Sequence, residues 1–187
     1  MEKRTFKGSA FLAPVPPALV SCGDSEHPNI ITIAWTGMLA STPPTTYVSV
    51  RRERFSHPII KENGEFVINL CTDKLVPAAD FCGIKSGRDT DKFAKCGLTA
   101  EKPFKLDKCP IIAESPINLE CKVREVVDLG SHDMFIADIV AVDVDESLID
   151  KKGKIHMEKA GLAAYVHGDY YSVGKKLGNF GFTVKKK

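Results

Sequence analysis

The sequence has almost no excess of charge of either sign. Its 187 residues include 26 Lys and Arg and 24 Asp and Glu, which gives a formal net charge of +2. Such a balance argues against a broad basic surface for nucleic acid. The small positive excess lies at the C-terminal end, in Lys175, Lys176, Lys185, Lys186 and Lys187. We interpret this end as a solvated tail, with binding of nucleic acid through it as the alternative.

Long apolar segments are also missing. No stretch approaches the roughly 18 to 20 uninterrupted apolar residues of a membrane-spanning helix. Residues 1–8 are charged and carry neither the apolar stretch nor the cleavage site of a secretory signal. Neither an internal repeat nor a Gly/Ser-rich linker divides the chain. We therefore expect one domain over residues 1–187, in the cytoplasm, with no membrane partner.

The cysteines lack the close spacing of a metal site. There is no C-x-x-C pair, and the absence of an export signal argues against structural disulfides. We predict free, mostly buried thiols, with one exposed reactive thiol as the alternative. The six residues are Cys22, Cys71, Cys82, Cys96, Cys109 and Cys121.

Several catalytic motifs are absent. The chain has no G-x-G-x-x-G after a strand, no G-x-x-x-x-G-K-[ST], no H-E-x-x-H and no G-x-S-x-G. These absences exclude a Rossmann-type site, a P-loop, a zinc protease of that type and a serine-hydrolase elbow. The five histidines are scattered singly, so we predict no catalytic side chain and no metal site.

Short β-branched segments separated by Gly, Pro or Asn dominate what is present. They predict strands over residues 18–22, 30–34, 46–51, 65–70, 117–129 and 135–144. The first two form a hairpin with a long turn. Connections are short and there is no βαβ rhythm, so we expect an antiparallel barrel, mainly β, with short accessory helices.

Two of these strands differ in their pattern. Apolar and polar residues alternate along 117–124, which predicts one face in water, with Asn118 and Glu120 on it. Residues 135–144 are apolar on both faces and should lie deeper.

Helical spacing predicts three short helices, over residues 56–64, 72–81 and 91–96. Ser56 has the character of an N-cap for the first of them. Because Pro43 and Pro44 remove two backbone donors, residues 36–44 are predicted to be a loop.

Basic and hydroxylated residues gather in two further loops. Arg51, Arg52 and Arg54 precede Ser56 at a helix start, a combination that suits a phosphate group. A solvent-exposed basic turn is the alternative. In the loop 82–92, helix capping explains the Asp and Thr, whereas Gly87 and Arg88 indicate a segment close to a polar ligand.

Segments spread over most of the chain resemble the FMN-binding split-barrel flavin reductases, and within them the flavoredoxin branch. The resemblance rests on 29–36 (NIITIAWT), 41–44 (STPP), 48–51 (VSVR), 54–60 (RFSHPII), 65–69 (EFVIN), 82–83 (CG), 86–93 (SGRDTDKF) and 170–178 (YYSVGKKLG), in family order.

This resemblance implies a six-stranded Greek-key split barrel that forms a homodimer with one FMN per subunit. Residues 34–38 would meet the flavin, residues 49–51 would line the same site, Arg54 and Ser56 would take the phosphate, and residues 82–92 would close it. The implied cofactor residues are Ala34, Trp35, Thr36, Gly37, Met38, Ser49, Val50, Arg51, Arg54, Ser56, Cys82, Gly83, Ser86, Asp89, Lys92 and His167. For Trp35, packing in the core is the alternative.

The implied activity is that of an oxidoreductase. Electrons from NAD(P)H would pass through bound FMN to a flavin, a metal or a protein. The alternative is an electron-transfer protein of the flavoredoxin type, reduced by a partner protein. In either case the cofactor carries the redox chemistry and no side-chain nucleophile is required.

Overall fold

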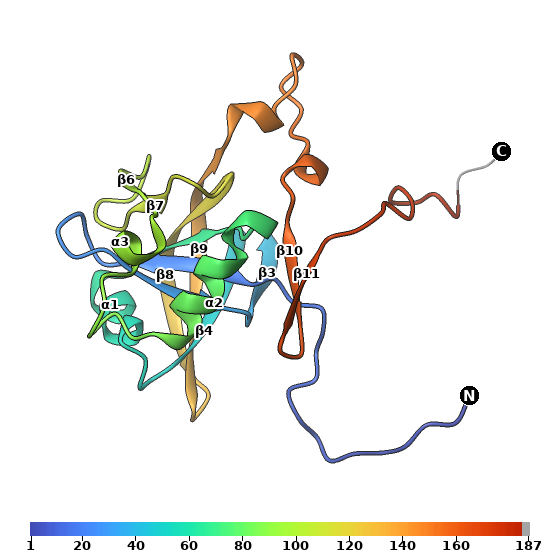
Figure 1. Ribbon diagram of the computed structural model, residues 1–187, viewed down its shortest axis with the longest axis horizontal. Helices are drawn as coiled ribbons and strands as arrows, with labels where there is room; N and C mark the ends of the chain where they lie inside the picture. The colour runs from blue at the N-terminus through green and yellow to red at the C-terminus, as the bar shows by residue number, and fades with distance from the viewer. Residues whose placement is uncertain (185–187) are drawn as a thin grey trace.

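A curled antiparallel sheet forms the body of the molecule in the computed structural model, which describes residues 1–184 (Figure 1). Its strand order is β2-β1-β5-β8-β9-β4-β3. The strands are β1 (Ala18–Cys22), β2 (Asn29–Ile33), β3 (Thr36–Ser41), β4 (Pro44–Arg51), β5 (Glu65–Asn69), β8 (Ile117–Asp128) and β9 (His132–Val144). Two small sheets pair β6 (Ala100–Glu101) with β7 (Ile111–Ile112), and β10 (Ala163–Val166) with β11 (Asp169–Ser172).

The two edges of the main sheet are joined by one bent segment of chain. Only Ala34 and Trp35 separate β2 from β3, yet β2 pairs with β1 and β3 pairs with β4. Across the bend, Ser49 donates its backbone N–H to the Trp35 carbonyl at 3.0 Å. When β2 and β3 are counted as one bent strand, the sheet has the six strands that were expected. The prediction of a mainly β fold with short helices is confirmed.

The concave side of the sheet encloses the main apolar core. Along β4, Val48 and Val50 are fully buried while Ser49 and Arg51 point outward, as the two-residue period of a strand requires. Phe66 and Phe135 are fully buried in the same cluster, and burial of each contributes about 1.5–3 kcal/mol. The helix α1 (Ser56–Asn63) covers one end of this core.

A second apolar cluster lies on the opposite side of β1 and β2. There η1 (Asp73–Leu75), α2 (Val76–Ile84) and α3 (Lys92–Cys96) pack against Leu19 and Ile30. Every residue of β1 is buried, because β1 lies between the two clusters. Thr32 donates to the Ala79 carbonyl at 2.5 Å, which joins α2 to β2.

Two expectations about local structure are wrong. Residues 36–41 form β3 instead of a loop, because Pro43 and Pro44 lie at the turn and at the start of β4, where the missing donors cost little. Ser56 begins α1 but does not cap it: Phe55 holds the cap position and makes no side-chain bond, and the Ser56 hydroxyl accepts from Asn29 instead.

A third error concerns the face of β8 predicted to be wet. Asn118 and Glu120 are buried there, because the segment between β6 and β7 crosses this face. The Glu120 carboxylate accepts backbone N–H groups from Phe104, Lys105 and Leu106. In β9 the burial predicted for the whole strand is reached in its first half, whereas Val142 is 51% exposed.

The remaining elements follow the sequence closely. The helix α2 continues to Ile84, into the stretch expected to be a loop. All six cysteines are free; five are buried and Cys96 is half-buried, which confirms the prediction of free, mostly buried thiols.

The tail lysines Lys185, Lys186 and Lys187 lie outside the described residues. Over residues 1–184, no helix is long and apolar enough to cross a membrane.

Candidate cofactor site

A cationic pocket of about 500 Å³ opens where the end of β4 meets the end of α2. Five cationic side chains and one carboxylate line it, so it favours an anionic ligand. Hydroxyl groups of two serines add neutral hydrogen-bonding groups. The lining residues are Ile31, Arg51, Glu53, Arg54, Phe55, Ser56, Cys82, Lys85, Ser86, Gly87, Arg88 and Lys92.

The last residue of β4, Arg51, and the loop between β4 and α1, which carries Arg54, present two of the arginines to this pocket. Arg54 donates its backbone N–H to the Arg51 carbonyl at 3.1 Å, and His57 donates to the Arg54 carbonyl at 2.9 Å. The Arg54 Nη1 reaches across to the Gly83 carbonyl at 3.2 Å. This bond fixes the guanidinium between the loop and α2, with further N–H groups available to a ligand.

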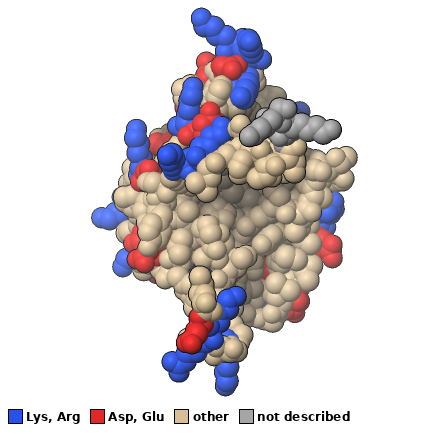
Figure 2. Space-filling view, turned by 90° about the vertical axis from the view of Figure 1, so that its right-hand side faces the viewer, with Lys and Arg blue, Asp and Glu red and all other residues tan. Residues whose placement is uncertain are grey.

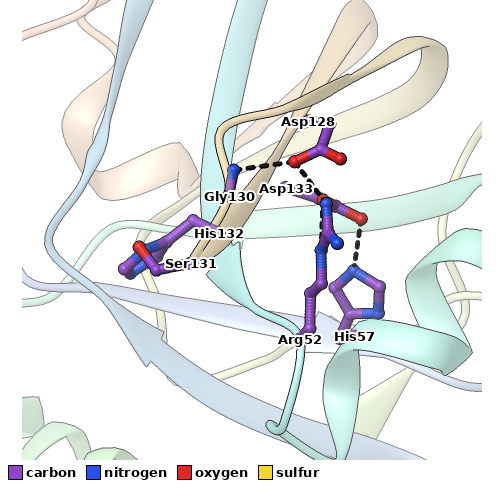
Figure 3. Close-up of polar contacts among 7 residues, drawn as sticks. All are labelled: Arg52, His57, Asp128, Gly130, Ser131, His132 and Asp133. Carbon is purple, nitrogen blue, oxygen red and sulfur yellow. Dashed lines mark hydrogen bonds and ion pairs between the residues drawn. The ribbon is translucent and has the colours of Figure 1, made fainter.

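Asp133 on β9 holds both ends of this loop (Figure 3). Its Oδ1 accepts from Arg52 Nε at 2.8 Å, and its Oδ2 lies 2.9 Å from His57 Nε2. Arg52 also pairs with Asp128 on the neighbouring strand. Burial opposes ionisation of Asp133, but the bonds from His57 and Arg52 outweigh it and lower the pKa of this carboxyl. The loop is therefore clamped by a carboxylate that stays charged.

The loop between α2 and α3 is the second loop of the pocket, and Asn29 and Gly87 hold it against the barrel. Asn29 donates to the Ser56 hydroxyl at 2.7 Å. A Cβ on Gly87 would lie 2.0 Å from Asn29 Oδ1 and 2.9 Å from the Phe55 ring, so only glycine permits this approach. The sequence pattern indicated Gly87 and Arg88 as residues near a ligand, but it gave no sign of the part played by Asn29.

Lys92 is a buried cation in the wall of the pocket. Only 3% exposed, it donates from Nζ to the Ile30 carbonyl at 2.7 Å and to the Cys82 carbonyl at 2.9 Å. Burial lowers its pKa, and the nearby thiols oppose that shift. These two bonds tie α3 to α2 and β2 while adding positive charge to the pocket.

A second pocket, of about 470 Å³, adjoins the first. The two meet at α2: Cys82 lines the first pocket and Gly83 the second, and Arg54 of the first pocket donates to the Gly83 carbonyl. Three aromatic side chains and one carboxylate shape it, with the rings of Tyr165 and Tyr170 5.3 Å apart. Its lining is Pro17, Thr32, Ala34, Trp35, Asp80, Gly83, Ile84, Tyr165, Gly168 and Tyr170.

Trp35 forms a wall shared by this pocket and a third one of about 370 Å³ beside the N-terminal segment. Its ring lies 4.8 Å from that of His132 and is 45% exposed, so it is not a core aromatic. Figure 2 shows the side of the molecule on the right of Figure 1: a broad uncharged face, hollowed near its middle, with charged side chains of both signs above and below it.

The structure brings ten of the sixteen candidate residues to these pockets. Arg51, Arg54, Ser56, Cys82, Ser86 and Lys92 line the first; Ala34, Trp35 and Gly83 line the second; Thr36 lines the third.

The other six candidates lie elsewhere. Val50 is fully buried in the core, whereas Met38 on β3 is 61% exposed, next to Gly37. Ser49 is half-buried on the outer side of β4, and Asp89 is exposed. His167, at φ 52° in the turn between β10 and β11, places its ring 4.0 Å from that of Phe11.

Residues 11–174 match the family described as "Flavin reductase like domain". The chain belongs to this family. Flavoredoxin of Desulfovibrio vulgaris (Miyazaki F) is 32% identical and superposes with a TM-score of 0.89 over 99% of this chain and 100% of its own.

Two further proteins are similar to this chain in sequence. An uncharacterized protein of Archaeoglobus fulgidus is 34% identical over 78% of this chain and 81% of its own length. The FMN reductase (NADH) RutF of Enterobacter cloacae is 26% identical over 75% of this chain and 83% of its own length. The flavin reductase-like chain thus has the split-barrel fold that its sequence suggested. The family suggests an oxidoreductase with a flavin cofactor.

Proposed function

We propose that this protein is an FMN-binding oxidoreductase that passes electrons from NAD(P)H to a flavin, a metal or a protein acceptor. The observation that carries the proposal is the adjacency of the cationic pocket and the aromatic pocket. FMN has a phosphate group at one end and a planar ring system at the other, joined by a flexible hydroxylated chain. The cationic pocket suits the phosphate in charge, and the aromatic lining of the second pocket suits a planar ring system.

The residues of the first pocket suit the phosphate. Arg51, Arg54 and Arg88 offer forked donors, and the hydroxyls of Ser56 and Ser86 offer single ones. Bound flavin would supply two-electron redox chemistry. The chain's own residues bind and orient it: Arg54 is fixed by the Gly83 carbonyl, and Asp133 clamps the loop that carries Arg54 and follows Arg51.

A second copy of the chain is the partner that we propose for the uncharged face of Figure 2. Apolar side chains remain exposed on β3 and around it, among them Trp35, Met38 and Leu39. The N-terminal and C-terminal segments extend away from the body in Figure 1 and carry exposed Phe11 and Phe180. Exposed apolar side chains that gather on one face are typical of an interface. We propose a homodimer that covers part of the flavin.

Titration of two flavins tests the site. The Arg54→Ala variant should raise the Kd for FMN about tenfold or more, since a charge-assisted hydrogen bond contributes about 1.5–3 kcal/mol. Its Kd for riboflavin, which lacks the phosphate, should change little. The matched control is Arg124→Ala, because Arg124 pairs with Asp138 on β9 and lines none of the three pockets. Unchanged FMN affinity in Arg54→Ala would remove Arg54 from the phosphate site.

The similarity to flavoredoxin favours a second candidate, an electron carrier reduced by another protein. Anaerobic mixing of the FMN-loaded protein with NADH and with NADPH separates the two. Rapid bleaching of the flavin absorbance supports the reductase. No bleaching with either nucleotide, although dithionite still bleaches the flavin, supports the carrier.

A further inference from the structure

Two free thiols meet at the edge of the cationic pocket. Cys82 on α2 and Cys96 on α3 place their Sγ atoms 3.9 Å apart, within reach of an S–H···S hydrogen bond. No other pair of cysteines in residues 1–184 makes such a contact. Both belong to the second apolar cluster, where α2 and α3 pack together. The contact therefore joins the two helices whose residues form one wall of the pocket.

The two thiols differ in access. Cys82 lines the pocket, and burial, with a smaller effect of Cys96, raises the pKa of its thiol to about 12. Cys96 is only half-buried. The more accessible Cys96 is therefore the first of the two to meet a small disulfide. The buried Cys82 then serves as the resolving thiol, next to the positive charge of Lys92.

We propose that Cys82 and Cys96 are a redox modification site that closes to an intramolecular disulfide when it meets a low-molecular-weight disulfide. The Cys96 thiolate attacks one sulfur of the small disulfide, forming a mixed disulfide and expelling one thiolate. Cys82 then loses its proton and attacks Cys96 Sγ, expelling the second. The protein loses two protons and two electrons. The small disulfide takes up both electrons, and each expelled thiolate takes one of the two protons and leaves as a thiol.

Closure of this bond would change the cationic pocket. An S–S bond of about 2.05 Å requires the two sulfurs to approach from 3.9 Å, by about 1.9 Å. Cys82 is itself a lining residue, and its carbonyl accepts from Lys92, which lies on α3 one turn before Cys96. The Cys82 sulfur therefore leaves its present place in the wall, and a shift of α2 against α3 would move Lys92 as well. We expect weaker flavin binding in the oxidised form, a consequence that rests on the proposed function.

Oxidation of the cofactor-free chain by excess glutathione disulfide tests the modification. Alkylation and intact mass should show that two of the six thiols are lost, and peptide mapping should give a Cys82–Cys96 bond that dithiothreitol reverses. Cys82→Ser should stop at a glutathione adduct on Cys96. Cys96→Ser should keep its five thiols, and the control Cys121→Ser, altered in the barrel core, should still form the bond. Six free thiols after treatment, or a bond between other cysteines or between chains, would overturn the proposal.

FMN titration of both forms tests the coupling. The oxidised wild type should bind FMN about fivefold or more weakly than the reduced form, the lower end of common coupling strengths. Cys96→Ser treated in the same way should show no change. If neither form binds FMN, the proposed function fails while the disulfide result stands. If both forms bind equally well, the effect on the pocket is refuted.

Discussion

Asp133 Oδ2 lies 2.9 Å from His57 Nε2, across a sequence separation of 76 residues. The other oxygen of the same carboxylate accepts from Arg52, so one side chain of β9 holds both ends of the loop that carries Arg54. Figure 3 shows Arg52 and His57 approaching Asp133 from the two ends of this loop. The position of the cationic pocket therefore depends on a residue outside it.

The variant Asp133→Asn should loosen this loop. The amide keeps the volume but loses the charge, and it accepts through one atom where the carboxylate accepts through two. We expect the free energy of unfolding to fall by about 1–3 kcal/mol and the Kd for FMN to rise more than the Kd for riboflavin. Urea unfolding and the two titrations measure this.

Asp138→Asn is the matched control for that variant, because it also removes a carboxylate that pairs with an arginine, Arg124. This pair is exposed and should contribute little. A purely structural role for Asp133 would lower stability and leave the ratio of the two flavin affinities unchanged.

Gly87→Ala should damage the pocket from the other side. The added Cβ would lie 2.0 Å from Asn29 Oδ1, and Asn29 is held by its bond to Ser56. Either the loop must move away or Asn29 must lose its hydrogen bond to Ser56, so we expect FMN affinity to fall severalfold. Gly174→Ala is the control, since nothing lies within 4 Å of its added Cβ. Equal FMN affinity in the two variants would show that the close approach of Gly87 does not matter.

Local sequence patterns predicted most of the strands and helices of the fold. The turn residues between 23 and 29 and the β-branched segment after them predicted the hairpin of β1 and β2, which the structure confirms. The loop predicted from Pro43 and Pro44 was wrong, because the effect of a proline depends on where the end or edge of a strand lies. That position is a property of the whole sheet. The exposure predicted for Glu120 was wrong for a similar reason. Its strand alternates as if one face were in water, but the segment from Phe104 to Leu106, 14–16 residues away in sequence, covers that face.

The site was predictable only in part. Arginine and serine at a helix start are a local signal, and Arg51, Arg54 and Ser56 do line one pocket. The residues that position them are distant along the chain: Asp133 is 81 residues from Arg52, and Asn29 is 27 from Ser56. Such pairings follow from strand register, which one sequence does not reveal.

Lys92→Met tests the buried cation. The change keeps the length of the side chain but leaves the carbonyls of Ile30 and Cys82 without their donor. An unsatisfied buried carbonyl costs about 1–3 kcal/mol, so we expect a lower urea midpoint and weaker FMN binding. Lys95→Met, an exposed change on the same helix, should alter neither. A stability equal to wild type would show that the two carbonyls find water or other donors.

Asp143 and Glu120 make the stability of the barrel depend on pH. The Oδ2 of Asp143 is buried and has no hydrogen-bond partner. Burial, together with the nearby charge of Glu120, raises the pKa of Asp143 to about 6. The folded protein therefore holds a proton there that the unfolded chain, with a pKa of about 3.9, has already released. This contribution is complete below about pH 4 and is lost as the pH rises through about 6.

Asp143→Asn should remove that dependence. The amide is neutral at every pH and can donate to Glu120, so the variant should be more stable than wild type at pH 8. Because solvent screens this half-buried group, we expect a gain of about 1 kcal/mol instead of the full value of a two-unit shift. Urea midpoints at pH 8 and pH 4.5 measure the gain, which should shrink at the lower pH. Asp107→Asn, an exposed carboxylate that pairs with Lys122, is the control and should show no gain at pH 8. A gain for Asp143→Asn that stays constant between the two pH values would mean that its cause is packing and not the proton on Asp143.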